Sequence, residues 1–203
     1  MSGDATHWDQ VYRTKGLDEV SWYQGEPEVS LRLIDEYAES QGAAVDVGAG
    51  RSLLTIRLLE RGWHPVTAVD ISATALAELA AQAPPGAHLR CVTSDVLAWQ
   101  PEEPVMLWHD RAVFHFLTSA EDQQSYVELA SRTVRVGGLL VLGCFAADGP
   151  TQCSGLDVCR YDPEALQQRF LRDFSPVHQV REEHQTPWGA IQPFTWVVMR
   201  RRG

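Results

Sequence analysis

No apolar run in the 203-residue chain approaches the length of about 20 residues that a membrane-spanning helix needs. The opening stretch "MSGDATHWDQ" also lacks the charged-then-apolar pattern of a signal peptide. Positive charge is scarce, because 17 Lys and Arg stand against 27 Asp and Glu, for a net charge of −10. This balance argues against a nucleic acid or an anionic membrane as the main partner. We therefore expect a cytoplasmic protein that binds neither.

Paired cysteines are lacking as well. The four cysteines, Cys91, Cys144, Cys153 and Cys159, contain no CxxC pair, so we expect free thiols and no metal site. Cys153 and Cys159 flank a loop and could alternatively bind a soft metalloid. Repeats and low-complexity tracts are also missing, and the length suits one domain over 1–203. We divide it into an N-terminal arm, 1–25, and a core, 26–203, in a monomer or homodimer.

Strand and helix patterns alternate through the core. Short apolar runs predict strands, and segments with apolar residues at helical spacing predict helices. Strands are expected at 43–47, 65–70, 88–95, 105–110 and 139–145, and helices at 27–37, 53–62, 73–82, 119–138 and 163–170. Two β-rich runs at 176–186 and 190–201 suit a terminal hairpin. Repeated strand–helix units predict an α/β fold with a doubly wound, mostly parallel sheet and helices on both faces.

Polar residues stand where these strands end. Asp46 and Gly48 follow the first strand, Asp70 ends the second, and Asp95 follows the third. His109 and Asp110 end the fourth. Because ligands of such sheets bind at the carboxyl ends of the strands, we expect these residues to form a site.

The turn Gly48–Ala49–Gly50 is typical of a backbone that approaches a ligand closely. A nucleoside triphosphate is disfavoured, because no Lys–Ser/Thr pair follows the turn. A dinucleotide fits the two glycines and Asp70, but Leu53 occupies the third glycine position and Asp46 would repel a pyrophosphate. Asp46 would instead attract S-adenosylmethionine, because this ligand carries a sulfonium and an ammonium and no phosphate.

Four motifs in order resemble the class I S-adenosylmethionine-dependent methyltransferases. They are "VDVGAGRS", "AVDIS", "TSDVLAW" and "RVGGLLVLG", and the resemblance covers about residues 27–145. It implies a Rossmann-like, seven-stranded sheet with an antiparallel last strand, S-adenosyl-L-methionine as cofactor and S-adenosyl-L-homocysteine as product. The cofactor contacts that we predict on this basis are Trp22, Asp46, Gly48, Ala49, Gly50, Asp70, Ile71, Asp95, Val96, His109 and Asp110.

The ends of this region resemble particular branches of the family. "HWDQVYRTKGLDEVSWYQGEPE" is similar to the arm of small-molecule methyltransferases for thiols, thiopurines or chalcogen oxyanions, and also to that of protein lysine methyltransferases. "DRAVFHFLT" resembles the Asp-Arg-x-x-x-His-x-Leu segment of the small-molecule branch. We therefore predict a soft or anionic small-molecule acceptor, with a protein lysine as the alternative. An NAD-dependent oxidoreductase and a binding module without turnover are the more distant alternatives.

Candidate acceptor contacts follow from the same segments. We predict that Tyr23, Gln24, Arg111 and His115 bind the acceptor, with Arg111 orienting it and His115 acting as general base or contact. Structural interpretations stay open beside these. His115 lies between two phenylalanines and could be a packed histidine, and Arg111 could simply pair with Asp110 or with the acidic arm. Aromatic residues of the arm could form a lid, or could only pack the arm onto the core.

Overall fold

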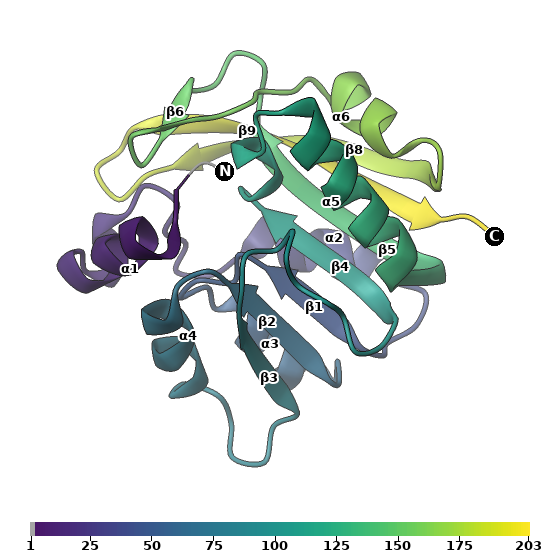
Figure 1. Ribbon diagram of the computed structural model, residues 1–203, viewed down its shortest axis with the longest axis horizontal. Coiled ribbons are helices and arrows are strands. Elements are labelled where there is room, and N and C mark those ends of the chain that lie inside the picture. Colours follow the sequence, from purple (N-terminus) through teal and green to yellow (C-terminus); the bar gives the residue numbers. More distant parts are fainter. Residues whose placement is uncertain (1–2) are drawn as a thin grey trace.

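The computed structural model describes residues 3–203, and its centre is a seven-stranded sheet in the order β3-β2-β1-β4-β5-β9-β8 (Figure 1). Its strands are β1 (Ala44–Val47), β2 (Val66–Asp70), β3 (Leu89–Thr93), β4 (Val105–Arg111), β5 (Val134–Phe145), β8 (Phe174–Gln185) and β9 (Ile191–Arg201). The first five are parallel, whereas β9 runs antiparallel to both of its neighbours. The predicted Rossmann-like sheet with an antiparallel C-terminal strand is confirmed.

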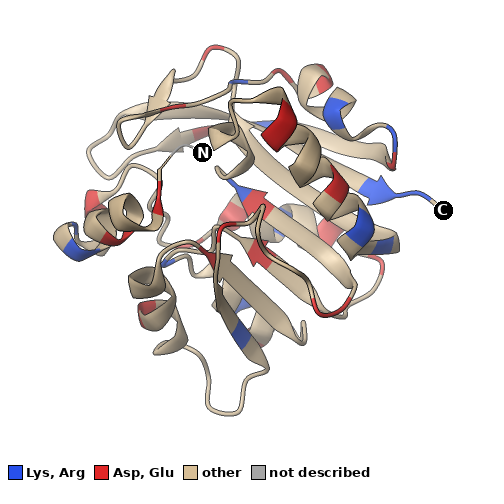
Figure 2. Ribbon diagram, in the orientation of Figure 1, with Lys and Arg blue, Asp and Glu red and all other residues tan. Residues whose placement is uncertain are grey.

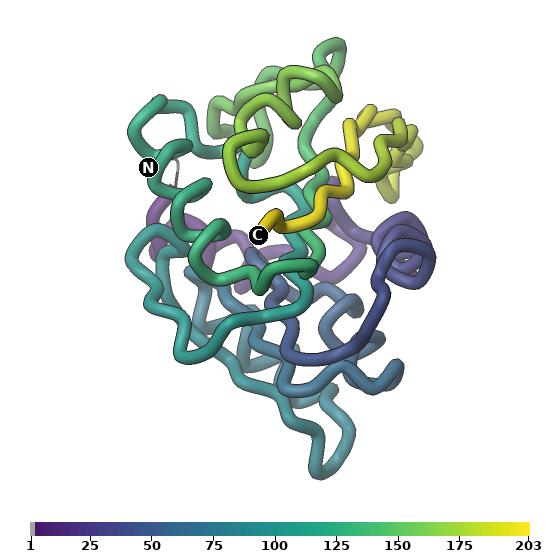
Figure 3. The backbone as a smooth tube through the Cα atoms, turned by 90° about the vertical axis from the view of Figure 1, so that its right-hand side faces the viewer, coloured from purple at the N-terminus to yellow at the C-terminus, as the bar shows by residue number. Residues whose placement is uncertain are grey.

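Helices cover both faces of this sheet. They are α1 (Ala5–Thr14), α2 (Glu28–Tyr37), α3 (Leu54–Glu60), α4 (Ala73–Ala80), α5 (Ala120–Thr133) and α6 (Pro163–Phe170), with short 3-10 turns η1 (Leu17–Glu19) and η2 (Phe114–Phe116). In side view, α2 in dark blue and α5 in green lie on opposite flanks (Figure 3). A two-stranded hairpin of β6 (Gln152–Cys153) and β7 (Leu156–Asp157) stands apart from the sheet. Among residues 3–203, no helix combines the length and apolar character needed to cross a membrane.

One predicted boundary was wrong. The helix predicted over 119–138 ends at Thr133, and Val134 already begins β5. Val134 pairs with Val105, whereas the next paired residue, Leu139, faces Leu107, so the residues between form a bulge. Gly138 belongs in this bulge, because an added Cβ would lie 2.9 Å from the Arg135 carbonyl oxygen. Pairing with a neighbouring strand thus overrides a local helical pattern.

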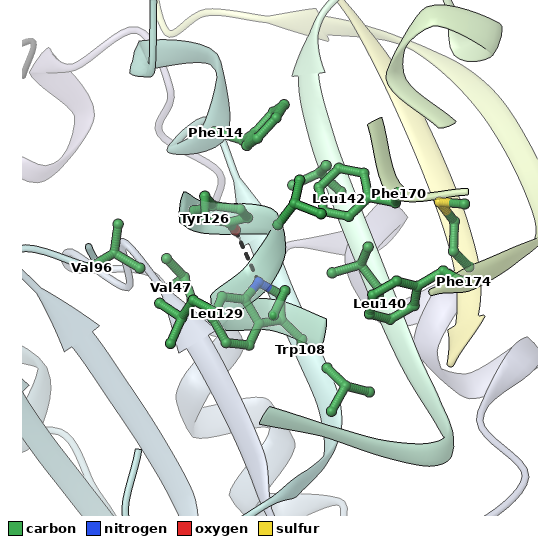
Figure 4. Packing of buried hydrophobic residues seen from close by; sticks show 14 of the residues in the cluster. Val47, Val96, Trp108, Phe114, Tyr126, Leu129, Leu140, Leu142, Phe170 and Phe174 are labelled. Carbon is green, nitrogen blue, oxygen red and sulfur yellow. Dashed lines mark hydrogen bonds between the residues drawn. The ribbon is translucent and has the colours of Figure 1, made fainter. Parts of the chain in front are cut away.

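A buried hydrogen-bond chain links the core to the end of β4. Trp108 donates from Nε1 to the Tyr126 hydroxyl across 2.9 Å (Figure 4). That hydroxyl in turn donates to Asp110. The backbone N–H groups of Val113 and Phe114 also donate to the Asp110 carboxylate. Asp110 is fully buried, and burial raises its pKa to about 6 although these donors oppose the shift. Asp110 therefore holds the turn that leads into η2 through these two backbone N–H groups.

We predict that Asp110→Asn changes the pH dependence of stability. Between the ordinary carboxyl pKa of about 4 and the folded value of about 6, the folded protein holds a proton that the unfolded chain releases. Stability must therefore fall as the pH rises through this window, by an amount on the order of 3 kcal/mol. Urea unfolding of both proteins from pH 4 to pH 7 measures this effect. As the pH rises through this window, the free energy of unfolding of the asparagine variant should increase relative to that of the unaltered protein. A difference between the two proteins that does not change with pH would contradict the prediction.

Candidate active site

Asp70 ends β2 with its carboxylate between two loops. Gly50 N–H donates to Oδ2 and Ser72 N–H donates to Oδ1, each across 2.8 Å. Burial raises the pKa of this carboxyl to about 6, against the two N–H donors, and the charges of Asp46 and Asp9 add to the rise. Each oxygen keeps lone-pair capacity beyond its one N–H bond, so the carboxylate could accept the two hydroxyls of a ribose.

The glycine turn leaves no room for side chains. Gly48 and Gly50 have φ values of +64° and +51°, which glycine adopts readily. A Cβ on Gly48 would lie 2.1 Å from the Val113 side chain, and one on Gly50 would lie 2.5 Å from the Tyr12 hydroxyl. The two glycines therefore let the turn approach both the arm and the segment after β4.

Asp46 and His109 face each other in the register of β1 and β4. Asp46 Oδ1 lies 2.9 Å from His109 Nδ1, and Thr55 donates its hydroxyl to Oδ2 across 2.8 Å. Because a carboxylate only accepts, Nδ1 carries the proton that it donates to Asp46, and Nε2 lies 2.9 Å from the Ser30 hydroxyl. Sequence reasoning predicted Asp46 and His109 but missed Ser30 and Thr55, whose partners are set only by the fold.

Two adjoining cavities lie at this edge of the sheet, where acidic residues end several central strands (Figure 2). The main cavity, together with the open solvent at its mouth, spans about 880 Å³. The predicted residues that line it are Trp22, Gly48, Asp70, Ile71, Asp95, Val96 and Arg111. The second cavity spans about 690 Å³, again with open solvent included. It is lined by the predicted residues Trp22, Tyr23, Gln24, Asp46, Gly48, Ala49, Gly50, His109 and Arg111. Most of the predicted site is thus brought together, and Arg111 lines both cavities.

Asp110 and His115 line neither cavity. His115 is fully buried, with its ring centroid 4.5 Å from that of Phe116 and 4.8 Å from that of Phe145. Burial, together with the charge of Arg111, lowers its pKa to about 3. Its Nδ1 accepts weakly from the Phe145 N–H at 3.5 Å. This environment matches the packed-histidine interpretation, and it makes the imidazole a weak base at neutral pH.

The N-terminal arm is fastened to both loops that hold Asp70. Asp9 accepts from the Ser72 hydroxyl at 2.6 Å and from the Thr74 N–H at 3.2 Å. Arg51 donates to the Tyr12 carbonyl oxygen and, across 3.0 Å, to that of Lys15. Sequence reasoning missed both fastenings.

Aromatic residues fill the space beneath the arm. The ring centroid of Trp8 lies 5.9 Å from that of Trp22 and 5.3 Å from that of Phe116. The arm therefore both packs on the core and roofs the main cavity. Tyr23 remains 37% exposed, and Gln24 donates to Glu182 across 3.0 Å.

Cys153 and Cys159 have different surroundings. Cys153 is buried and lines the main cavity, whereas Cys159 donates to the Leu117 carbonyl oxygen at 3.7 Å. Among the described residues, 3–203, no group of three His, Cys, Asp or Glu side chains is placed to hold a metal ion.

The family model described as a methyltransferase domain matches residues 44–138, from β1 into β5. Within these bounds the chain matches a methyltransferase domain. The prediction of an S-adenosylmethionine-dependent methyltransferase is confirmed, with S-adenosyl-L-methionine as its cofactor. The residues of the main cavity fit that molecule, since they include the Asp70 carboxylate for the ribose hydroxyls beside Gly48 of the turn.

Solved structures share the fold of this methyltransferase domain and its flanking segments. The N-methyltransferase NodS from Bradyrhizobium japonicum, in complex with S-adenosyl-L-homocysteine, has a TM-score of 0.76 at 15% identity, over 97% of this chain and 100% of that one. A protein solved in a study of the conversion of a disulfide bond into a thioacetal group during echinomycin biosynthesis has a TM-score of 0.77 at 18% identity, over 98% and 93%.

A third similar structure is the 1,6-didemethyltoxoflavin-N1-methyltransferase of Burkholderia thailandensis. It has a TM-score of 0.69 at 23% identity, over 87% of this chain and 78% of that one. No curated protein matches the chain. At such identities the structures establish the shared fold, and the acceptor has to be argued from the cavity itself.

We predict that Asp70→Asn weakens binding of S-adenosyl-L-homocysteine at least tenfold, because hydroxyl bonds to a charged carboxylate contribute about 1.5–3 kcal/mol each. The affinity of the unaltered protein should also rise as the pH increases through about 6, because ribose hydroxyls donate to the ionised form. The variant should lose this rise. Calorimetry from pH 5 to pH 8 measures both, with circular dichroism as the folding control, and equal affinities would remove Asp70 from the site.

We predict that Asp9→Ala or Arg51→Met speeds the release of S-adenosyl-L-homocysteine several-fold, because either change unfastens α1 from a loop that holds Asp70. Stopped-flow tryptophan fluorescence can follow release, since Trp8 and Trp22 line the main cavity. Arg13→Met is the matched control: Arg13 also pairs with Asp9, at 3.5 Å, but its side chain is 67% exposed. Release rates that equal those of the control would show that the fastenings do not retain the ligand.

Proposed function

We propose that the protein transfers a methyl group from S-adenosyl-L-methionine to a soft or anionic small molecule, such as a thiolate or a metalloid or chalcogen oxyanion. The bound donor supplies a methyl group activated by a sulfonium. The acceptor's lone pair forms the new bond to that carbon, and the carbon–sulfur bond breaks with its electrons left on sulfur. Enclosing the reactants under the arm would exclude water and hold them in line.

One observation carries the choice of acceptor: the described lining of the main cavity offers no histidine or lysine that could act as a general base. Its ionisable carboxylates, Asp70 and Asp95, lie at the donor end. Beyond them its described lining holds Arg111, Phe116 and Cys153 and includes no histidine or lysine. An acceptor that arrives already ionised needs no general base, whereas an ammonium does. The cation of Arg111 also favours a negative acceptor over a positive one.

The roles of the lining residues follow from their places. We assign the donor to Trp22, Asp46, Gly48, Ala49, Gly50, Asp70, Ile71, Asp95 and Val96, with His109 orienting Asp46. We assign the acceptor to Arg111, Tyr23 and Gln24. We assign His115 and Asp110 a structural role next to the site. Because burial lowers the pKa of His115 to about 3, we do not assign it the role of general base.

Solved relatives of the fold act on varied acceptors. They include a protein from the conversion of a disulfide bond into a thioacetal group, the 1,6-didemethyltoxoflavin-N1-methyltransferase and a glycopeptide N-methyltransferase. The first is associated with sulfur chemistry, whereas the other two are named as N-methyltransferases. A protein lysine is the second candidate, favoured by the net charge of −10, which would attract a basic target.

The test is S-adenosyl-L-homocysteine release across thiols, selenium, tellurium and arsenic oxyanions, amines and carboxylic acids. We expect release with thiols or oxyanions and none with amines, and the Asp70→Ala variant gives the background. Mass spectrometry of a lysate incubated with labelled donor tests the protein-lysine alternative. Turnover confined to lysine side chains would overturn the small-molecule proposal, and binding of NADH without S-adenosylmethionine would overturn the donor.

A further inference from the structure

Arg111 is a partly buried cation that has no acidic partner among the described residues. Its Nη1 donates to the Trp22 carbonyl oxygen across 2.9 Å. Its Nε and Nη2 are buried and lack any hydrogen-bond partner within residues 3–203, and no carboxylate of that range forms an ion pair with it. By contrast, the side chain of Arg51 reaches Glu78 at 2.6 Å. Buried donors left unpaired are costly, so this arrangement calls for a partner from outside the chain.

The plane of the guanidinium is already set. Its Cζ lies 4.7 Å from the centre of the Phe194 ring, and the bond to Trp22 fixes the Nη1 side. The edge formed by Nε and Nη2 is left without a hydrogen-bond partner in the part of the chain that the structure describes. Two parallel N–H groups on one edge of a guanidinium match the two oxygens of a carboxylate.

Neighbouring groups do not satisfy this edge. Glu182 is the acid whose charge acts on Arg111, but its Oε1 accepts from Gln24 and its Oε2 accepts from Trp196 at 2.7 Å. Burial lowers the pKa of Arg111, and the charges of Glu182 and Cys153 oppose that shift. An arginine keeps its charge throughout the neutral range.

We propose that the Nε–Nη2 edge of Arg111 is a receptor for the carboxylate of a bound ligand. The proposal rests on the proposed function, because the two cavities that Arg111 lines are those assigned to donor and acceptor. Two sources share this chemistry: the methionine carboxylate of the donor, and a carboxylate carried by the acceptor. Because the edge is shielded from solvent, little water would compete for it.

Matched pairs that differ in one carboxylate distinguish the two sources. S-adenosylmethionine and its decarboxylated form differ only at the methionine carboxylate, and calorimetry compares their affinities without turnover. 2-Mercaptobenzoate and 2-mercaptobenzamide form the acceptor pair, compared by calorimetry on the protein loaded with S-adenosyl-L-homocysteine. We expect the unaltered protein to prefer the carboxylate member of one pair by at least about tenfold, as a charge-assisted bidentate contact implies.

Three variants test whether Arg111 causes that preference. Arg111→Met should abolish it, Arg111→Lys should keep only part of it because a point charge replaces the fork, and Arg181→Met should leave it intact. Arg181 is the matched control, since it is an arginine on β8 that is paired with Asp148 at the surface. Thermal unfolding checks each fold, and Arg111→Lys decides if Arg111→Met does not fold.

A preference in the donor pair that Arg111→Met removes identifies the methionine carboxylate, and one in the acceptor pair identifies a carboxylate acceptor. Absence of preference in both pairs, or a preference that survives in Arg111→Met, overturns the proposal. A preference in Arg111→Lys equal to that of the unaltered protein overturns the forked geometry. Failure of the proposed function looks different: either S-adenosylmethionine does not bind to the unaltered protein, or turnover is confined to lysine side chains.

Discussion

The site depends on one buried carboxylate, that of Asp70, held by one backbone N–H from each of two loops. Gly50 belongs to the turn after β1 and Ser72 belongs to the turn after β2, so a single side chain fixes the spacing of two neighbouring strand ends. The arm then fastens to these same two turns through Asp9 and Arg51. Cofactor site and roof are therefore assembled around one charge, whose burial is costly unless the hydrogen bonds around it persist.

Burial lowers the pKa of both His115 and Arg111, but the consequence at neutral pH differs. It makes His115 a weak base, whereas Arg111 stays charged because its unperturbed pKa is so high. A site desolvated in this way suits positioning of an ionised acceptor better than abstraction of a proton. The same desolvation strengthens every ionic contact made inside the closed cavity.

Much of the fold followed from the sequence because its signals are local. Apolar runs predicted the strands, and parallel strands necessarily bring their terminal residues, such as Asp46, Asp70 and His109, to one edge. The start of β5 was missed because Val134 is held by pairing with Val105, a contact that no local pattern encodes. Spacing alone placed His115 near the site, but could not reveal that its ring points between two phenylalanines rather than into a cavity.

The fastening residues were missed for a related reason: Asp9 and Ser72 are 63 positions apart in the sequence. The two fastenings also differ in kind. Arg51 donates to carbonyl oxygens, a group that every amino acid carries, so these two hydrogen bonds do not depend on the side chains at positions 12 and 15. The Tyr12 ring adds a contact of its own, since its centre lies 5.1 Å from the Arg51 guanidinium carbon. Asp9, by contrast, must keep an accepting side chain. The aromatic residues that face the cavity can therefore be exchanged, and the roof can so adapt to new acceptors, while the hydrogen bonds of Asp9 and Arg51 stay in place.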